Sequence, residues 1–177
     1  MVIITINANR DGSFSVNGRF FENKKEENRK RADELFNLLE LQYPALFLPP
    51  SQPTVESEGI FYRHYPDTGS IIGIIEGDLY FADANGDIQN WGKVDYWFDY
   101  LKTEFIFDWL ENQFPEILAP SSQLTVDAGE YFYRSYPDTN VMIASFQGDL
   151  YFIDNAGTIH NLGSINEWLI QAGYYTD

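Results

Sequence analysis

The sequence predicts an α+β fold in which two tandem repeats, each a helix, a proline strap and a four-stranded antiparallel meander, form one pseudo-symmetric domain. The segment FYRHYPDTG at residues 61–69 returns as FYRSYPDTN at 132–140, and GDLYF at 77–81 returns at 148–152 with the same offset of 71 residues. In each copy, a run with helical spacing of apolar residues precedes several strand-like runs separated by turn residues. The repeated unit therefore spans most of the chain.

The expected organisation has three parts. Residues 1–31 form an N-terminal strand hairpin and the start of a charged helix, residues 32–102 form the first repeat, and residues 103–173 form the second. A helix predicted at about 94–112 closes the first repeat and opens the second, so we expect one compact body. A chain of 177 residues is long enough to bury a core without disulfides or a structural metal.

The N-terminal part begins with an alternating strand at residues 2–7, and a turn at 11–12 returns the chain as a second strand over 13–21. A charged run then becomes a helix. This helix is expected to end before Tyr43-Pro44, because proline disfavours helical geometry in the residue that precedes it.

A proline strap follows the helix in each repeat, at 45–59 and at 116–129. The turns between the strands after it are too short for crossover connections, so neighbouring strands must be antiparallel. Ser164 is expected to cap a last helix over 164–172. The strands are expected at 60–65, 70–75, 78–82 and 87–91, and again near 131–136, 141–146, 149–153 and 158–162.

The charge of the chain is strongly negative and unevenly distributed. Residues 1–31 carry seven of the 11 basic side chains and a net charge of +3, whereas the remainder has 23 acidic and four basic side chains and a net charge of −19. Such a surface repels phosphates, so we expect neither nucleic acid nor membrane as a partner. We expect a cytoplasmic protein if the chain is complete, and an extracellular one if it is an excised module.

Several kinds of chemistry are excluded by the residue inventory. There is no Cys, and the two histidines, His64 and His160, do not lie at matching positions of the repeats. The run at 83–87 begins like a calcium loop, but Ile88 stands where that loop needs glycine, so a plain hairpin turn is favoured. We therefore expect no metal, no cofactor and no enzymatic activity.

One strand face is identical in the two copies, and it places an arginine between two aromatic rings. In the structural interpretation, each arginine stacks on its tyrosine and forks onto an aspartate of a turn. In the functional interpretation, the arginines line two equivalent pockets for an anionic or sugar ligand. The face consists of Phe61, Arg63, Tyr65 and Phe132, Arg134, Tyr136, and the candidate aspartates are Asp67, Asp78 and Asp83 with their matches Asp138, Asp149 and Asp154.

A second aromatic group comprises Trp91, Tyr96, Trp97 and Tyr100. It has the composition of a sugar-stacking platform. The same rings could instead pack the following helix on the sheet. The sequence leaves both interpretations, a sugar-stacking platform and a packing cluster, open.

The order of motifs in the repeat resembles a repeat module of uncharacterised bacterial proteins. That module runs FNWAE, YP, FxP, YRYYPxT, LGV, GxVYV and VG, and its carriers are often exported or joined to other domains. The resemblance covers both repeats, although Ala144 stands where the first copy has Gly73, and it implies a shared fold with no activity attached. It is carried by Leu35-Phe36-Asn37, Tyr43-Pro44, Phe47, Pro49, Tyr62-Arg63, Tyr65-Pro66, Thr68, Gly73, Gly77, Tyr80 and Gly92.

These observations lead us to expect a non-enzymatic binding or interaction module that presents two similar surfaces to a protein or a polysaccharide. One alternative is an acidic inhibitor or immunity-type protein that covers a basic site on a partner. Another is a carboxylate-based glycoside hydrolase, which would require two carboxylates facing each other across one pocket.

Overall fold

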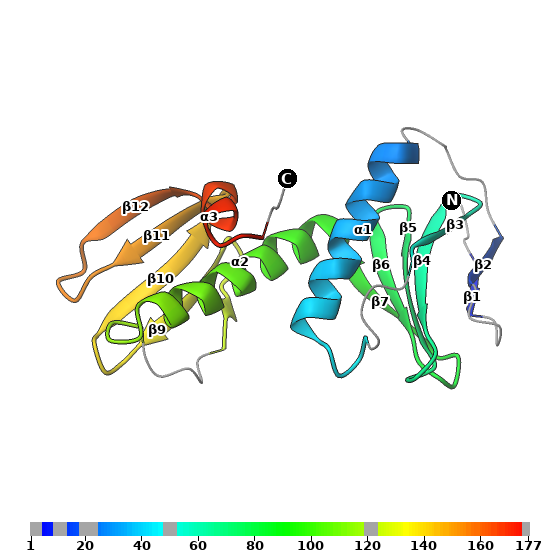
Figure 1. The fold of residues 1–177 in the computed structure, drawn as a ribbon, viewed down its shortest axis with the longest axis horizontal. Helices are drawn as coiled ribbons and strands as arrows, with labels where there is room; N and C mark the ends of the chain where they lie inside the picture. Colours follow the sequence, from blue (N-terminus) through cyan, green and yellow to red (C-terminus); the bar gives the residue numbers. More distant parts are fainter. Residues whose placement is uncertain (1–4, 9–13, 18–24, 48–52, 119–123, 175–177) are drawn as a thin grey trace. The chain divides into compact units, whose positions relative to one another are not determined.

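The computed structural model describes residues 5–8, 14–17, 25–47, 53–118 and 124–174. In this part of the chain the fold is α+β, with three helices, two five-stranded antiparallel sheets and one two-stranded hairpin (Figure 1). The chain divides into two compact units, residues 1–98 and 99–177. That boundary and the expected one after residue 102 both lie inside helix α2 (Val94–Gln113).

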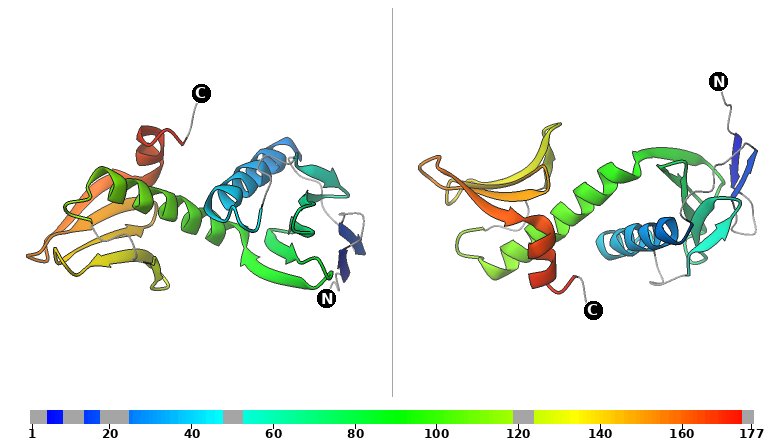
Figure 2. Two further views of the ribbon diagram at one scale, coloured as in Figure 1. Left: turned by 60° about the horizontal axis from the view of Figure 1, so that its bottom comes forward. Right: turned by 90° about the horizontal axis from the view of Figure 1, so that it is seen from above.

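The first unit contains a sheet with the strand order β3-β4-β5-β6-β7, in which each strand is antiparallel to its neighbours. Helix α1 (Lys25–Gln42) lies on one side of this sheet, and the hairpin of β1 (Thr5–Ala8) and β2 (Phe14–Asn17) lies on the other (Figures 1 and 2). The strands are β3 (Val55–Ser57), β4 (Ile60–Tyr65), β5 (Ser70–Ile75), β6 (Asp78–Ala82) and β7 (Ile88–Lys93).

The second unit has the corresponding order, β8-β9-β10-β11-β12. The part of α2 from residue 99 onward and α3 (Ile165–Gln171) provide its helices, and the Ser164 hydroxyl caps α3 by accepting from the Asn166 amide at 3.2 Å. The strands are β8 (Val126–Asp127), β9 (Tyr131–Tyr136), β10 (Val141–Phe146), β11 (Asp149–Ile153) and β12 (Ile159–Ser164).

Each sheet has one strand more than the four that we predicted. The end of the strap pairs with the first strand of the meander, with Val55 opposite Tyr62 and Val126 opposite Tyr133. In the first unit, Glu58 and Gly59 connect the pair with φ of 52° and 82°, the signs that a tight two-residue hairpin turn needs. We predicted the first strap, with its three prolines, as an ordered connection without a strand.

Most other predicted elements lie close to the observed ones. Helix α1 ends at Gln42, directly before Tyr43-Pro44, and α2 spans the predicted stretch with one residue more at its end. The predicted strand at residues 2–7 is observed as Thr5–Ala8, and its return strand as Phe14–Asn17. The turn predicted at 11–12 lies outside the described residues.

The core of each unit lies between its helices and one face of its sheet. We call this the inner face; in the second unit it holds Tyr136, Ile143 and Leu150, which pack with Phe107 and Leu110 of α2. We call the opposite side of each sheet the outer face. In the first unit the outer face is also buried, and Ala8 of the β1–β2 hairpin packs against it.

Candidate functional site

Arg63 lies on the inner face of β4, and only 4% of its surface is exposed. Its Nε donates to the Thr54 hydroxyl at 2.9 Å, and its Nη1 donates to the Asn37 amide oxygen at 2.8 Å and to the Glu40 carboxylate at 3.0 Å. Its Nη2 donates to the Asp33 carboxylate at 3.3 Å. Because positions 33, 37 and 40 share one side of a helix, α1 presents all three acceptors to the sheet together.

Arg134 makes the corresponding contacts in the second unit and is 3% exposed. Its Nε donates to the Thr125 hydroxyl, its Nη1 to Asp108 and its Nη2 to Glu104, each at 2.9 Å, and Glu111 lies 3.1 Å from Nη1. Each of these residues stands 71 positions after its counterpart around Arg63. The one chemical difference is a carboxylate, Asp108, in the place of Asn37.

A buried tyrosine completes each network. The Tyr65 hydroxyl donates to Glu40 Oε1 at 2.9 Å, and the Tyr136 hydroxyl donates to Glu111 Oε1 at 2.6 Å. Burial, together with the neighbouring carboxylate, raises the pKa of both tyrosines well above the ordinary value of 10.0. For Arg134, burial acts to lower the pKa, but Glu104, Asp108 and Glu111 outweigh it and raise the pKa above its usual range.

The predicted partners of the two arginines were wrong. Each guanidinium lies over a phenylalanine of the helix and not over its tyrosine: the distance to the ring centroid is 5.4 Å from Arg63 to Phe36 and 5.5 Å from Arg134 to Phe107. The hydroxyls of the two tyrosines donate to glutamates of the helices. The inner face turns these side chains toward the helix, whereas the turn aspartates lie at strand ends.

Those turn aspartates have local roles. Asp67 and Asp138 lie in exposed turns, and Asp78 pairs with Lys93 at 2.8 Å. Asp83 Oδ1 accepts from the Asn85 and Asp87 amides at 2.9 Å and 3.0 Å, and Asp154 does the same in its own turn. In the described residues no group of three His, Cys, Asp or Glu side chains is placed to hold a metal ion.

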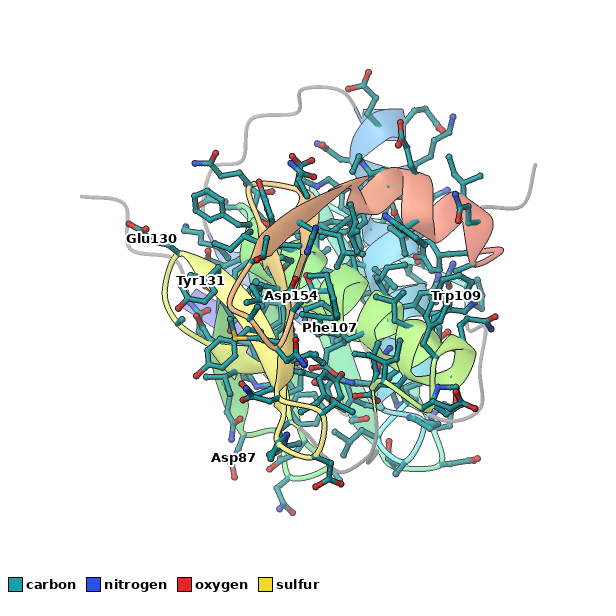
Figure 3. All side chains as sticks on the ribbon, turned by 90° about the vertical axis from the view of Figure 1, so that its left-hand side faces the viewer. Asp87, Phe107, Trp109, Glu130, Tyr131 and Asp154 are labelled. Carbon is teal, nitrogen blue, oxygen red and sulfur yellow. The ribbon has the colours of Figure 1, made fainter. Side chains whose placement is uncertain are left out.

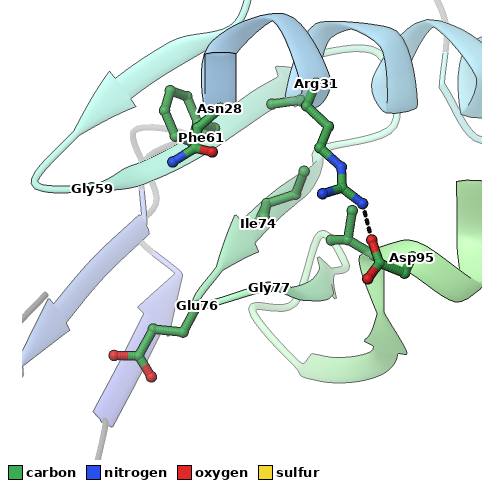
Figure 4. A pocket seen from close by; sticks show the side chains of 10 residues that line it. Asn28, Arg31, Gly59, Phe61, Ile74, Glu76, Gly77 and Asp95 are labelled. Atoms are coloured by element: carbon green, nitrogen blue, oxygen red, sulfur yellow. Dashed lines mark hydrogen bonds and ion pairs between the residues drawn. The ribbon is translucent and has the colours of Figure 1, made fainter. Parts of the chain in front are cut away.

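A cleft of about 260 Å³ lies in the first unit between α1, the sheet and the first turn of α2 (Figure 4). Arg31 and Asp95 form an ion pair across it. Figure 4 shows Glu76, the other carboxylate of the lining, pointing away from that pair. The lining that matters here is Asn28, Arg31 and Ala32 of α1, Phe61 and Ile74 of the sheet, and Asp95 of α2.

A cleft of about 190 Å³ occupies the corresponding place in the second unit. Lys102 replaces Arg31, Asn166 replaces Asp95, and Phe132 matches Phe61. Its floor is more polar, because Thr103 and Ser145 stand where the first cleft has Ala32 and Ile74, and their hydroxyls lie 3.0 Å apart. Arg63 and Arg134 line neither cleft, so the sheet brings Phe61 and Phe132 to the clefts but holds both arginines in the helix contact.

The size of these clefts limits what they can hold. Pockets for whole small-molecule ligands are typically about 300–1,000 Å³. Volumes of 260 Å³ and 190 Å³ suit one side chain or one sugar ring, held against a phenylalanine beside a cation. Sequence reasoning missed Arg31 and Lys102, although the offset of 71 residues aligns them as two basic positions on two predicted helices.

The predicted tryptophan platform is a packed cluster of the first unit. Trp91 stacks on Phe81 with centroids 4.8 Å apart, and Trp97 lies 5.6 Å from Trp91 and donates its indole N–H to the Trp91 carbonyl at 2.7 Å. Tyr96 packs on Trp97, whereas Tyr100 belongs to the second unit, where it packs on Phe132. The second unit has Leu162 at the position of Trp91, so this cluster is not repeated.

No protein-family model and no curated protein matches the chain. None of the helices in the described residues combines the length and the apolar character that crossing a bilayer requires.

Breaking the buried network should be costly. Glu40→Leu leaves the Arg63 guanidinium buried without its main carboxylate, and we expect a loss of about 3–5 kcal/mol in the free energy of unfolding. The double variant Arg63→Met with Glu40→Leu should lose less than Glu40→Leu alone, because no charge is then left buried. Urea denaturation gives both values. Asp33→Asn, at a side chain that is 41% exposed, is the control and should lose less than about 1 kcal/mol. A Glu40→Leu loss no larger than the Asp33→Asn loss would contradict this role.

Stability should decrease in alkali. Folding raises the pKa of Tyr65 and Tyr136, so the stability that they contribute is fully present below their unfolded pKa of about 10 and is lost as the pH rises above it. Each should lower the free energy of unfolding by about 1.4 kcal/mol in total between pH 9 and 11, with a slope that approaches about 1.4 kcal/mol per pH unit well above pH 10. Urea denaturation between pH 9 and 11 measures this slope. The double variant Tyr65→Phe with Tyr136→Phe should flatten it, and the control is Tyr131→Phe, at an exposed ring. An equal slope in the double variant and the parent protein would refute the assignment.

Proposed function

We propose that this protein is a non-enzymatic binding module made of two tandem repeats of helix, proline strap and antiparallel sheet. Each repeat holds one residue of a peptide or a polysaccharide in its cleft. The proposal is supported by the two clefts, whose lining residues match one another at an offset of 71 residues. The repeats also belong, in this proposal, to the bacterial repeat module that their motifs resemble.

The chemistry of the cleft walls favours one residue of a polymer over a free metabolite. An aromatic wall beside Arg31 or Lys102 offers apolar contact on one side and hydrogen-bond donors on the other. The apolar floor of the first cleft suits an aliphatic group, whereas the hydroxyl-lined floor of the second suits a polar one. A polymer that presents both kinds of group would bind more tightly than either group alone.

Hydrolysis is a weaker interpretation of the same clefts. A glycoside hydrolase needs two carboxylates that flank the scissile bond. In the first cleft Asp95 is engaged by Arg31 and Glu76 points away from that pair. In the second cleft Asn166 stands at the position of Asp95, and the two carboxylates of its lining, Asp99 and Glu130, are both exposed. We therefore propose binding without turnover.

A specific observation also favours an acidic inhibitor or immunity-type protein as a second candidate. Of the four basic residues after position 31, Arg63 and Arg134 are buried, so Lys93 and Lys102 are the basic side chains left nearer the surface. Among the acidic side chains of the described residues after position 31, Glu40 alone is buried. Such a surface would attract a partner with a basic site.

Blocking the clefts tests the first candidate. Asn28→Trp and Asp99→Trp place a large ring at the mouth of the first and the second cleft, at matching positions of α1 and α2. On peptide and glycan arrays, each variant should lose at least about tenfold of the signal on the ligands that the parent protein binds. Lys30→Trp, an exposed α1 position outside the cleft, is the control and should bind as the parent does. Arrays without any ligand, or blocked variants that bind normally, would refute the proposal.

Salt distinguishes the two candidates. If the acidic surface drives association, the association rate should fall by about one to two orders of magnitude between 50 and 500 mM NaCl, because ions screen long-range attraction. A residue held in a cleft should keep its affinity within about threefold over the same range. Surface plasmon resonance on the array ligands measures both quantities. A rate that is independent of salt would leave the acidic-inhibitor candidate without its physical basis.

A further inference from the structure

The outer faces of the two sheets have the same pattern but different exposure. In the first unit this face is buried: Ile60, Tyr62, Ile71, Ile75 and Ala82 are 0–9% exposed, and Ala8 of the β1–β2 hairpin packs against them. In the first unit, the β1–β2 hairpin thus covers the apolar outer face of the sheet (Figure 1).

The outer face of the second sheet is equally apolar and more exposed. Tyr131, at the position of Ile60, is 40% exposed, and Ile159, at the position of Ile88, is 68% exposed. Figure 3 labels Tyr131, at the start of β9, and Phe107 of α2, which packs with the inner face of this sheet. In the described residues of the second unit, 99–118 and 124–174, no hairpin outside the sheet corresponds to β1–β2.

Strand pairing makes these side chains one continuous surface, because residues opposite each other on neighbouring strands point to the same side. Met142 lies opposite Ile153, which lies opposite Ile159, and together they form a row across three strands. A second row runs from Val126 through Tyr133 and Ala144 to Tyr151. An apolar surface of this kind is typical of a site for another protein.

We propose that the outer face of the second sheet binds an amphipathic β-hairpin of a partner protein, apolar on one side and basic in its flanks, as β1–β2 covers the outer face of the first sheet. The first unit provides the shape of the occupant. The site is separate from the clefts, which lie on the inner side of each sheet.

Charge decides between this occupant and a second copy of the chain. The second unit carries 12 acidic side chains against Lys102 and Arg134, a net charge of −10. A second copy would bring its own net charge of −16 to this surface. Residues 1–25, which include the hairpin, carry four basic and two acidic side chains, a net charge of +2, so a partner hairpin with similar flanks is attracted.

The area of the face sets the expected affinity. Five strands about 4.8 Å apart, with about five residues each, present roughly 400 Å². A partner that covered the whole face would bury about 800 Å² in total, and a short hairpin buries less, so the contact stays below the roughly 1,200–2,000 Å² of a stable interface and is weak and transient.

The probe is a synthetic peptide of residues 1–25, the segment that contains the hairpin, with four basic and two acidic side chains. Fluorescently labelled peptide titrated with the full chain in 50 mM NaCl should give saturable binding, with a Kd on the order of 100 µM. Binding should weaken severalfold at 500 mM NaCl. The peptide should not displace the chain's own hairpin, because the covalent connection gives that hairpin a millimolar effective concentration.

Matched variants locate the site. Met142→Lys and Ile159→Lys on the outer face should each weaken binding at least about tenfold, because each puts a positive charge against a basic partner. Ile170→Lys changes an isoleucine of α3 that is 60% exposed, close to the 68% of Ile159, and should leave binding unchanged. Circular dichroism confirms that the variants fold.

Three results would overturn the proposal. The first is no saturation up to 1 mM protein, and the second is an equal loss of binding in Ile170→Lys and Ile159→Lys. The third is self-association of the parent chain that Ile159→Lys abolishes, which would assign the face to a second copy. These results leave the proposal for the clefts untouched, because the variants on the outer face do not alter the cleft linings. The cleft variants Asn28→Trp and Asp99→Trp likewise leave the outer face intact.

Discussion

The fold of each unit depends on one arginine that is surrounded by acidic side chains of the preceding helix. A buried guanidinium is tolerated only with well-placed acceptors, and in both units the helix and the strap provide them. The contact fixes the rotation of the helix about its axis, because only one side of it carries the acceptors. It also fixes the register of the strand, since a slip by one residue would turn Arg63 or Arg134 to the outer face.

The same contact places the clefts. Once the arginine sets the helix on the sheet, the residue two positions before the first acceptor of the helix, Arg31 or Lys102, lies beside the first residue of the same strand face, Phe61 or Phe132. The position of each cleft therefore follows from the contact between the helix and the buried arginine. The buried network and the candidate binding surface use different residues, which allows the cleft walls to differ while the network stays nearly constant.

Much of the fold followed from the sequence, because local signals sufficed for it. The end of α1 before Tyr43-Pro44 and the strands of both meanders depend on neighbouring residues. The partners of Arg63 were out of reach, because Asp33 and Glu40 lie 30 and 23 positions away, and the acidic composition offered many equivalent candidates. The extra strand was missed because its pairing depends on a tight turn at Glu58-Gly59, which the proline content of the strap obscured.

The floors of the two clefts differ in a correlated way. Thr103 and Ser145 are 1% and 5% exposed and bond to one another, whereas the first unit has two apolar residues at these positions. A change at only one position would leave a buried hydroxyl that has lost its partner, at a cost of about 1–3 kcal/mol. The two floor positions are therefore coupled in energy. A path from one kind of floor to the other would pass through a less stable intermediate or change both positions together, so each floor resists piecemeal change.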